Sequence, residues 1–522
     1  MKRLNLLLVL LTFLIIPIHH LFAQAGNLDM SFGNGGIVKQ DITGNNDYGF
    51  ASAIQTDGKI LVAGFGNIDT LTYNDFVILR YQANGNLDSS FGINGLVKTD
   101  LSGGHDDQAM SICLQSDGKI LVAGRSLISN AYDFAVARYL TNGTLDSTFD
   151  GDGKVITDLG GINDYGNCIK MQADGKIVLT GFSNAAGINR LTTVRYLSNG
   201  SLDSTFDNDG VVLTQVGQVY IDGQSMSIQP DGKIVACATT KFPGNEYDVL
   251  IVRYNSDGSL DQSFDNDGIV TADVCYHDDA YALAIQNDGK ILVVGSSYDT
   301  VNITMGKNVM LMRFQSNGSV DGSFGIQGKV FTEVSNQADF ANSVAIQSNG
   351  KIVVVGRSAD GVSIFSIILV RYLSDGNLDN SFGAGGIVTT NLGNGHEYGQ
   401  SICLQADGRI VVAGFCNQGG FNMFVARYLG DEVPTTVSQF SSTGLEISPN
   451  PFVSYIKIHS EIFLQNVQLT LYNMQGQKLY VRHNLAGNDF IIPRNQLVAG
   501  MYLLKLEEKN KLAQVFKVSI KD

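Results

Sequence analysis

Apolar and polar positions alternate along the chain in short runs that predict β-strands. From Ala109 to Leu114, small residues alternate with bulky ones, the period of two expected of a strand with one covered face. The Ser116-Asp117-Gly118 turn follows, and Ile120 to Ala123 predicts a second, buried strand. Phe134 to Tyr139 and Lys154 to Thr157 predict two further strands. The third strand is apolar on both faces in most copies, as in Phe76 to Leu79, which places it in the middle of stacked sheets. The pattern therefore describes a unit of four strands joined by tight turns.

The unit recurs seven times, at steps of 57 to 61 residues. In each copy an Asp, or in one copy an Asn, is followed by Gly and then by Lys or Arg. The first residues of these motifs are Asp57, Asp117, Asp174, Asp231, Asp288, Asn349 and Asp407. Such a period means that the repeat decides the fold. Small residues on one face of the first strand, such as Ala280, Ala282 and Ala284, suit the place where wedge-shaped sheets crowd around an axis. The first strand is therefore expected to be the innermost.

Four-stranded units arranged radially form a β-propeller, and seven units fall in its usual range. We predict an all-β protein with a seven-bladed β-propeller of four-stranded blades over residues 26–429. A linear β-solenoid is the alternative, but it would need atypical capping repeats. The first repeat element, Leu28 to Phe32, opens a fourth strand, whereas the last unit ends after its third strand at Tyr428. The segment around Ile37 to Asp41 is therefore expected to complete the last blade and close the ring.

The two ends of the chain differ from the repeats. Residues 1–25 have the charged start, apolar stretch and Ala23-Gln24-Ala25 site of a secretory signal peptide, with an N-terminal membrane anchor as the alternative. After signal removal we expect no transmembrane segment. Residues 430–444 are polar and without period, as in a linker. Residues 445–522 alternate again, as in Val467 to Tyr472, and predict a small β-sandwich-like C-terminal domain.

Both parts of the chain resemble known families. The repeats resemble the delta-60 repeat family of predicted β-propeller units in bacterial secreted proteins, through Leu-Asp-x-Ser/Thr-Phe, Asp-Gly-Lys-Ile and Arg-Tyr/Phe elements in all seven units. Departures are minor: Val320 replaces Leu, Asn349 replaces Asp and Phe314 replaces Tyr. This resemblance implies a fold and no activity.

The tail resembles the C-terminal sorting domain of type IX (Por) secretion substrates of Bacteroidota. It has an Asn450-Pro451 opening, an Asn473 to Gln477 turn and a Leu497 to Tyr502 element in the expected order. The resemblance implies a cargo that the type IX machinery exports through the outer membrane. The protein would then be secreted or anchored on the outer surface.

Charge and cysteine content narrow the classes of partner. The formal net charge is −15, although residues 445–522 carry nine Lys or Arg and only six Asp or Glu. The acidic balance therefore belongs to the propeller, which argues against nucleic acid as a partner. The six Cys show neither metal-ligand spacing nor a paired framework, so they are expected to be small buried residues.

Two charged positions recur in every unit and predict an ion pair. An Arg in an apolar strand needs a partner, and a carboxylate offers bidentate bonds. We expect a structural pairing between these two sets. The arginines are Arg80, Arg138, Arg195, Arg253, Arg313, Arg371 and Arg427, and the aspartates of the Leu-Asp element are Asp29, Asp88, Asp146, Asp203, Asp261, Asp321 and Asp379.

A second acidic set precedes each innermost strand and is expected near one rim of the central channel. These residues are Asp47, Asp107, Asp164, Asp222, Asp278, Asp339 and Glu397, with Asp222 one position out of register. Carboxylates around one opening would favour calcium or a cationic ligand. The alternative, which we prefer, is that each carboxylate accepts backbone N–H bonds within its own loop. No other cofactor or metal is expected.

The sequence shows no nucleophile elbow, phosphate loop or paired Cys ligands, so it nominates no catalytic residue. His105, His277 and His396 lie beside acidic residues before innermost strands, but in different blades. The preferred function is binding of an extracellular ligand, a glycan or another protein, by a secreted or surface propeller. The alternatives are a secreted hydrolase or lyase acting on a polymer, with its site assembled from separate loops, and a purely structural surface protein.

Overall fold

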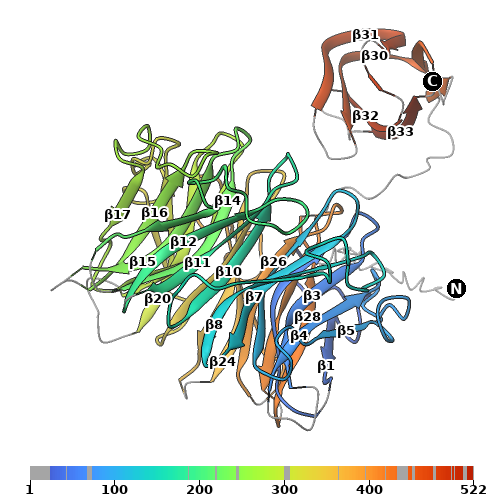
Figure 1. The fold of residues 1–522 in the computed structure, drawn as a ribbon. Coiled ribbons are helices and arrows are strands. Elements are labelled where there is room, and N and C mark those ends of the chain that lie inside the picture. Colours follow the sequence, from blue (N-terminus) through green and yellow to red (C-terminus); the bar gives the residue numbers. More distant parts are fainter. Residues whose placement is uncertain are drawn as a thin grey trace, which may run out of the picture.

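The computed structural model shows an all-β chain whose strands form seven four-stranded antiparallel sheets and one five-stranded sheet (Figure 1). The structure describes residues 24–42, 44–67, 73–185, 187–217, 220–242, 246–298, 306–361, 364–393, 395–417, 419–431, 445–448, 453–473, 478–494, 497–498, 500–508 and 514–520. The predicted signal peptide, except for its last two residues, and most of the predicted linker lie outside these ranges. No helix in the described ranges is long and apolar enough to cross a membrane.

The four-stranded sheets are the predicted blades, in which the first strand of each repeat is the innermost and the others follow outward. Blade 1 has β2 (Asp47–Ile54), β3 (Ile60–Gly66), β4 (Asp75–Tyr81) and β5 (Leu96–Thr99). Blade 2 has β6 (Asp107–Leu114), β7 (Ile120–Ile128), β8 (Ala131–Tyr139) and β9 (Lys154–Thr157). Blade 3 has β10 (Asp164–Met171), β11 (Ile177–Ala185), β12 (Ile188–Tyr196) and β13 (Val211–Thr214). Blade 4 has β14 (Tyr220–Ile228), β15 (Ile234–Lys241), β16 (Tyr247–Tyr254) and β17 (Ile269–Ala272).

The remaining blades follow the same plan until the last one. Blade 5 has β18 (Asp278–Ile285), β19 (Ile291–Tyr298), β20 (Lys307–Phe314) and β21 (Lys329–Thr332). Blade 6 has β22 (Asp339–Ile346), β23 (Ile352–Ala359), β24 (Phe365–Tyr372) and β25 (Ile387–Thr390). Blade 7 has β26 (Glu397–Leu404), β27 (Ile410–Asn417) and β28 (Phe421–Tyr428), and its fourth strand is β1 (Ile37–Gln40) from the N-terminus. The ring therefore closes through an N-terminal strand, because Ile37 pairs with Ala426 and Gln40 with Met423.

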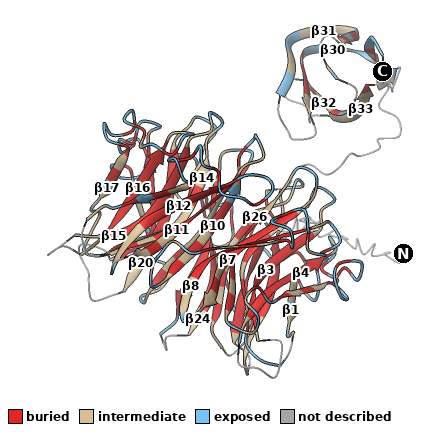
Figure 2. Cartoon of the chain, in the orientation of Figure 1, coloured by how far each residue is buried: buried red, intermediate tan, exposed pale blue. Residues whose placement is uncertain are grey.

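The second and third strands of the blades are buried along most of their length (Figure 2). Their apolar side chains fill the junctions between blades on both faces of each sheet. At the junction of blades 7 and 1, for example, Val62 and Val77 share a buried cluster with Val411 and Val425. The innermost strand of one blade approaches the second strand of the preceding blade so closely that small residues are required there. A Cβ at Gly49 would lie 2.7 Å from the carbonyl oxygen of Gly414. This contact agrees with the interpretation that small residues mark the innermost strand.

The C-terminal residues form their own sheet with its own core. Its strands are β29 (Leu445–Ser448), β30 (Tyr455–Asn473), β31 (Lys478–Pro493), β32 (Gly500–Glu508) and β33 (Gln514–Ile520). The two long strands pair along most of their length, with several register shifts, and the sheet curls around one cluster of apolar residues (Figure 1). That cluster includes Ile456, Leu469 and Leu504 and draws only on the C-terminal residues.

Candidate ligand-binding site at the central channel

Every innermost strand contains one β-bulge, and the bulged residues surround the axis of the ring. A bulge leaves one residue outside the ladder and re-aims its side chain. The bulged residues are Phe50, Met110, Asn167, Gln224, Tyr281, Asn342 and Gln400. All seven line one cavity of about 530 Å³, whose wall draws on the innermost strands of all seven blades. The central channel therefore carries a ring of seven side chains that differ in size and polarity.

Hydrogen bonds between neighbouring blades fix this wall. Asn167 donates from Nδ2 to the carbonyl of Gly223 in the next blade, over 2.8 Å. Asn342 makes the equivalent bond to Gly399, also over 2.8 Å. The hydroxyls of Ser52 and Ser401 lie 2.9 Å apart across the junction of blades 1 and 7. The cavity is therefore lined by polar groups whose positions are set before any ligand arrives.

Among the residues that the structure describes, Lys170 on β10 is the one charged residue that lines the cavity. Its side chain is exposed to the cavity, and the neighbouring thiol of Cys168 raises its pKa, so that its ammonium group stays charged. Cys113 and Cys403 also lie in its surroundings, and burial raises the pKa of both thiols. A cation enclosed in this channel would attract an anionic group of a ligand.

Aromatic rings gather where the innermost strands of blades 7 and 1 begin. The ring centroids of Tyr48 and Phe65 lie 5.1 Å apart, and those of Tyr398 and Phe415 lie 4.7 Å apart. Phe50, which also lines the cavity, stacks on Phe65 at 5.3 Å. Tyr48, Phe50 and Tyr398 are only half-buried. They offer ring faces at one end of the channel, and we call this aromatic group the channel mouth.

Arg357 of β23 belongs to the same mouth. Its guanidinium carbon lies 4.4 Å from the ring centroid of Phe340 and 5.2 Å from that of Tyr398. Within the described residues it makes ring contacts but no hydrogen bond or ion pair, and its Nε is a buried donor without a partner. Burial lowers the pKa of Arg357, although the group stays a cation. The equivalent Arg125 of blade 2, by contrast, donates from Nε to Gln108 over 2.8 Å.

A polar cluster in blade 5 lies beside Tyr281 of the cavity wall. Asp279 forms an ion pair with Lys307 and accepts a hydrogen bond from the Ser296 hydroxyl over 3.1 Å. Its Oδ1 lies 3.3 Å from Nε2 of His277. Burial lowers the pKa of His277, and Lys307 adds to this effect. Burial and the charge of Asp279 raise the pKa of Tyr281. At neutral pH this cluster therefore combines a neutral imidazole and a protonated phenol with Asp279 and Lys307.

The predicted rim carboxylates do not line the channel. None of the seven is among the residues that line the cavity, and Asp47, Asp107, Asp164, Asp278, Asp339 and Glu397 are fully buried at the blade junctions. Asp47 accepts the backbone N–H of Ile42 over 2.8 Å, and Asp107 that of Leu101 over 2.6 Å. These are the local loop bonds that the preferred alternative describes. Burial raises the pKa of Asp47 and Asp107 to about 6.

Asp222 differs from the other six because it is one residue out of register. Ile221 pairs with Thr240 in the place where Asp107 pairs with Ser126, so Asp222 projects to the opposite face of its strand. There it accepts a hydrogen bond from the Tyr220 hydroxyl over 3.2 Å. Burial raises the pKa of Asp222 to about 6. The structure therefore separates Asp222 from the other six carboxylates, with which the sequence pattern grouped it.

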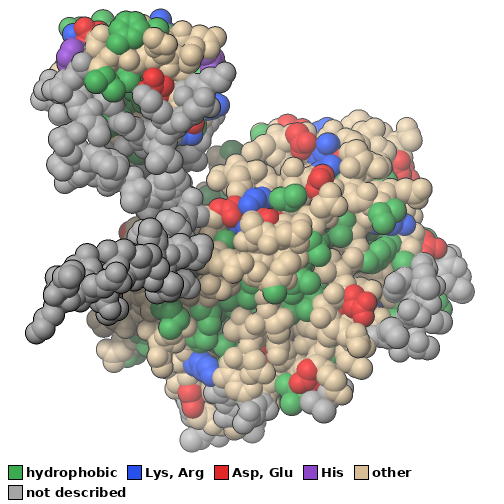
Figure 3. Space-filling view, turned by 180° about the vertical axis from the view of Figure 1, so that it is seen from behind, with side chains coloured by type: hydrophobic (Ala, Val, Ile, Leu, Met, Phe, Trp, Pro, Cys, Tyr) green, Lys and Arg blue, Asp and Glu red, His purple; other side chains and the backbone are tan. Residues whose placement is uncertain are grey.

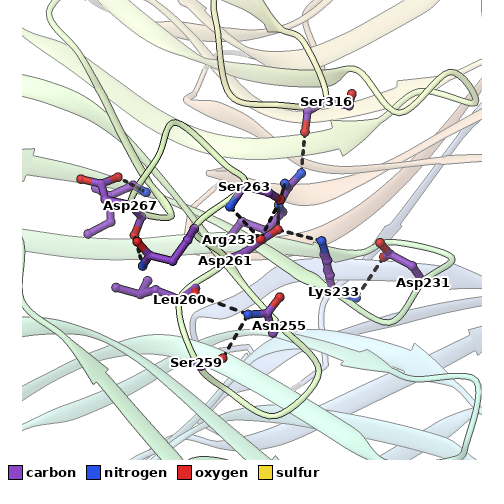
Figure 4. A network of polar contacts seen from close by, with 12 residues as sticks. Asp231, Lys233, Arg253, Asn255, Ser259, Leu260, Asp261, Ser263, Asp267 and Ser316 are labelled. Atoms are coloured by element: carbon purple, nitrogen blue, oxygen red, sulfur yellow. Dashed lines mark hydrogen bonds and ion pairs between the residues drawn. The ribbon is translucent and has the colours of Figure 1, made fainter.

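The repeated Arg and Asp lie in contact in every blade, as the network around Arg253 shows (Figure 4). Arg253 Nε lies 2.7 Å from Asp261 Oδ2, and Lys233 of the Asp-Gly-Lys turn lies 2.9 Å from the same oxygen. The guanidinium also stacks on Phe264 and donates to the carbonyl of Ser316 in the next blade. The Nε–Oδ2 distances are 2.7 to 2.9 Å for Arg80–Asp88, Arg138–Asp146, Arg195–Asp203, Arg253–Asp261, Arg313–Asp321, Arg371–Asp379 and Arg427–Asp29. The Asp261 carboxylate thus joins the Arg-Tyr and Asp-Gly-Lys elements to its own Leu-Asp element.

These pairs change the acidity of the aspartates. Burial alone would raise the pKa of Asp88, but hydrogen bonds from Ser90 and the charges of Lys59 and Arg80 lower it to about 2. The carboxylates of the Leu-Asp elements are therefore ionised at neutral pH and fully engaged within the protein. Their surroundings leave them no free face for a ligand.

Sequence reasoning missed the residues whose side chains line the channel. The bulged position is occupied by Phe, Met, Asn, Gln, Tyr, Asn and Gln in the seven blades, so no shared residue type marks it. The sequence did carry a pattern that could have indicated the aromatic channel mouth. An aromatic residue directly follows a predicted rim carboxylate in four units, at Tyr48, Tyr165, Phe340 and Tyr398. Period-two alternation places that position on the face opposite to the carboxylate.

Two family models match the chain. Residues 55–91, 115–149, 172–206, 229–264, 286–324 and 347–382 match a β-propeller domain of unknown function. Residues 446–521 match the secretion system C-terminal sorting domain. This agrees with both resemblances found in the sequence and indicates secretion or a cell-surface location. No curated protein matches the chain.

Solved structures of low similarity were also found. A PL25 ulvan lyase bound to its saccharide has 14% identity, a TM-score of 0.43, and coverage of 76% of this chain and 96% of its own. The α-L-arabinofuranosidase of Fusarium graminearum with arabinobiose has 10% identity, a TM-score of 0.38, and coverage of 77% and 96%. The extracellular domain of a hybrid two-component system protein from B. thetaiotaomicron has 8% identity, a TM-score of 0.27, and coverage of 91% and 73%.

Similarities at this level establish neither the fold nor an activity of this chain. The assignment of the architecture therefore relies on the strand pairing and on the family models. The chain therefore carries the β-propeller repeats of this domain family and ends in a secretion system C-terminal sorting domain.

Proposed function

We propose that this secreted or surface-displayed propeller binds an acidic glycan at the channel mouth. The observation that carries the proposal is Arg357, a cation held between the rings of Phe340 and Tyr398 with a buried, unpartnered Nε. An unsatisfied buried donor is costly, and a ligand oxygen would remove that cost. Ring faces beside it suit the apolar face of a sugar ring, and the guanidinium suits a carboxylate or sulfate.

The channel wall supports the same ligand class. Lys170, the second-last residue of β10, supplies a second cation to the cavity wall, and the amides of Asn167, Gln224, Asn342 and Gln400 line the same space. Amide and hydroxyl groups are the usual partners of sugar hydroxyls. The propeller carries the acidic balance of the chain, so the cations of the channel are a local exception to its net negative charge. Figure 3 shows apolar side chains exposed within one face of the molecule, with charged side chains scattered around them.

A binding experiment with the purified chain tests this proposal. The chain is titrated by calorimetry with a panel of uronate-containing or sulfated polysaccharides and with neutral polysaccharides. We expect heat with at least one acidic glycan, and at least a tenfold loss of affinity for Arg357→Met and Tyr398→Ala. Matched controls are Arg482→Met in the tail and Phe331→Ala on the outer strand β21, both at exposed positions. Binding that is unchanged in Arg357→Met, or that is confined to neutral glycans, would contradict the proposal.

The blade 5 cluster is the observation that favours the second candidate, a lyase acting on the same ligand class. A neutral His277 can take the proton next to a uronate carboxyl group, and the Tyr281 hydroxyl can protonate the leaving oxygen as the carbon–oxygen bond breaks and a double bond forms. Incubation of the chain with each bound glycan, followed by measurement of new ends and of unsaturated products, decides between the two. Products that disappear in Tyr281→Phe would favour catalysis, whereas retention of intact glycan would favour binding alone.

A further inference from the structure

Within the described part of the chain, three blade junctions each bring three aspartates together. In each, the oxygens lie within 4.8 Å of one another, and the groups are Asp75, Asp100 and Asp107; Asp133, Asp158 and Asp164; and Asp248, Asp273 and Asp278. One residue opens or nearly opens a third strand, one follows the adjoining fourth strand, and one opens the innermost strand of the next blade. The arrangement is thus built from the same three positions each time and joins two blades.

Two of the three carboxylates in each group are buried, and the third is exposed. Asp133 is 6% exposed and Asp164 is 0% exposed, whereas Asp158 lies at the surface. Asp248 and Asp278 have the same values of 6% and 0%, and Asp273 is again exposed. An ion from solvent could therefore reach each group through its exposed member. Burying several carboxylates together is unfavourable unless a cation or protons compensate them.

The second and third groups contain buried carboxylates that no protein group compensates. In the described residues, Asp133 and Asp248 have no hydrogen bond and no ion pair, although both are more than nine-tenths buried. Oδ1 of the fully buried Asp164 also has no hydrogen-bond partner. The first group differs because Nζ of Lys98 lies 3.1 Å from Oδ2 of Asp75. The positions equivalent to Lys98 are Ile156 and Thr271, so neither of the other groups has this lysine.

The remaining junctions show the same positions with fewer carboxylates. The residue five before each third-strand Arg is Asp in blades 1, 2 and 4, but it is Arg190, Asn308, Ser366 and Asn422 in blades 3, 5, 6 and 7. A strand-pairing role alone does not require Asp there, because four blades fold with other residues. The three-carboxylate groups are therefore a feature of particular junctions.

We propose that the junction of blades 2 and 3 (Asp133, Asp158, Asp164) and the junction of blades 4 and 5 (Asp248, Asp273, Asp278) each bind one calcium ion. Calcium prefers several carboxylate oxygens, with carbonyls and water completing its coordination. At the junction of blades 1 and 2, the Lys98 ammonium takes the place of the ion. The bound calcium would tie two adjacent blades together.

The test uses the mature full-length chain and calcium alone as the probe. Extracellular calcium modules bind with dissociation constants of about 0.1 to 1 mM, so the calorimetric titration should extend to about 10 mM. We expect two ions per chain and a rise in Tm with calcium. Asp133→Asn and Asp248→Asn should each leave one ion, and the double variant none, with circular dichroism confirming the fold of each. Asp57→Asn, at an exposed turn, is the control and should keep two.

A gain of binding provides the sharper measurement. Lys98→Met removes the cation from the first group and should raise the number of bound ions from two to three. Absence of calcium-dependent heat and of a Tm shift in the parent would overturn the proposal, and so would unchanged stoichiometry in the folded Asp133→Asn and Asp248→Asn variants. Two ions in Lys98→Met would overturn the assignment of the lysine as the substitute for calcium.

Discussion

Arg427 of the last blade forms its ion pair with Asp29, which lies 398 residues earlier in the chain, over an Nε–Oδ2 distance of 2.9 Å. Its guanidinium also stacks on Phe32. The N-terminal segment therefore supplies blade 7 with more than its outer strand. It also supplies the aspartate and the aromatic ring that every other blade takes from its own repeat. Closure of the ring thus repeats the internal bonding of a normal blade.

Removing this segment should open the ring. Deletion of residues 26–42 would leave β28 without β1 and Arg427 without its carboxylate, so that an exposed sheet edge and an unpaired buried charge appear together. We expect aggregation, measured by light scattering and size-exclusion chromatography. Deletion of residues 445–522 serves as the control and should leave a monomeric propeller. A monomeric 26–42 deletion as stable as the parent would contradict the closure.

The Arg–Asp pair should be coupled strongly. Replacing one partner of a buried pair leaves the other charge uncompensated, at a typical cost of about 3–5 kcal/mol. Arg253→Met and Asp261→Asn should each lower the free energy of unfolding by an amount of this order, and the double variant should cost less than the sum. Urea unfolding of the four proteins of this cycle measures the coupling. Additive losses would show that the pair contributes no interaction of its own.

Glu397 should make the propeller less stable as the pH rises. Burial raises its pKa from 4.5 to about 7, although the backbone N–H of Leu392 and the charge of Lys39 oppose the shift. Between these two values the folded state holds a proton that the unfolded state has lost, so the free energy of unfolding falls with increasing pH. Glu397→Gln should remove this fall and be more stable than the parent above pH 7.

Urea unfolding at pH 5 and pH 8 measures this difference. Asp88 should change the free energy of unfolding with pH in the opposite direction to Glu397, because its pKa is lowered from 3.8 to about 2. Its contribution to stability is complete above pH 3.8 and is lost as the pH falls towards 2. Parallel stability curves for the parent and Glu397→Gln between pH 5 and pH 8 would contradict the assignment of the proton to Glu397.

The C-terminal domain should be needed for export and not for folding of the propeller. Its core draws on no propeller residue, and its sequence matches a sorting domain. Truncation after Leu429 should leave a folded propeller in the periplasm of the source bacterium, as judged by cell fractionation and protease accessibility. Normal surface display of the truncated chain would refute this prediction.

The fold was predictable because the same pattern of four strands and their turns recurs seven times along the chain. The alternation of Ala109 to Leu114 and the position of Leu28 in a partial repeat were enough to predict four strands per blade and the shared last blade. The register of Asp222 and the bulge at Phe50 were not predictable, since a shift of one residue depends on packing between blades rather than on residue type. The role of Arg357 was hidden for a similar reason, because its partners come from blades 6 and 7.

The seven bulges also bear on how such a protein can change over evolutionary time. A bulged residue such as Gln224 lies outside the paired register of its sheet, and its side chain points towards the axis. Substitution there leaves the paired strands intact, although at Asn167 and Asn342 it also removes a hydrogen bond to the next blade. A lineage could therefore acquire a new ligand by a few single-residue changes, while the repeats that surround the channel stay under constant selection for closure of the ring.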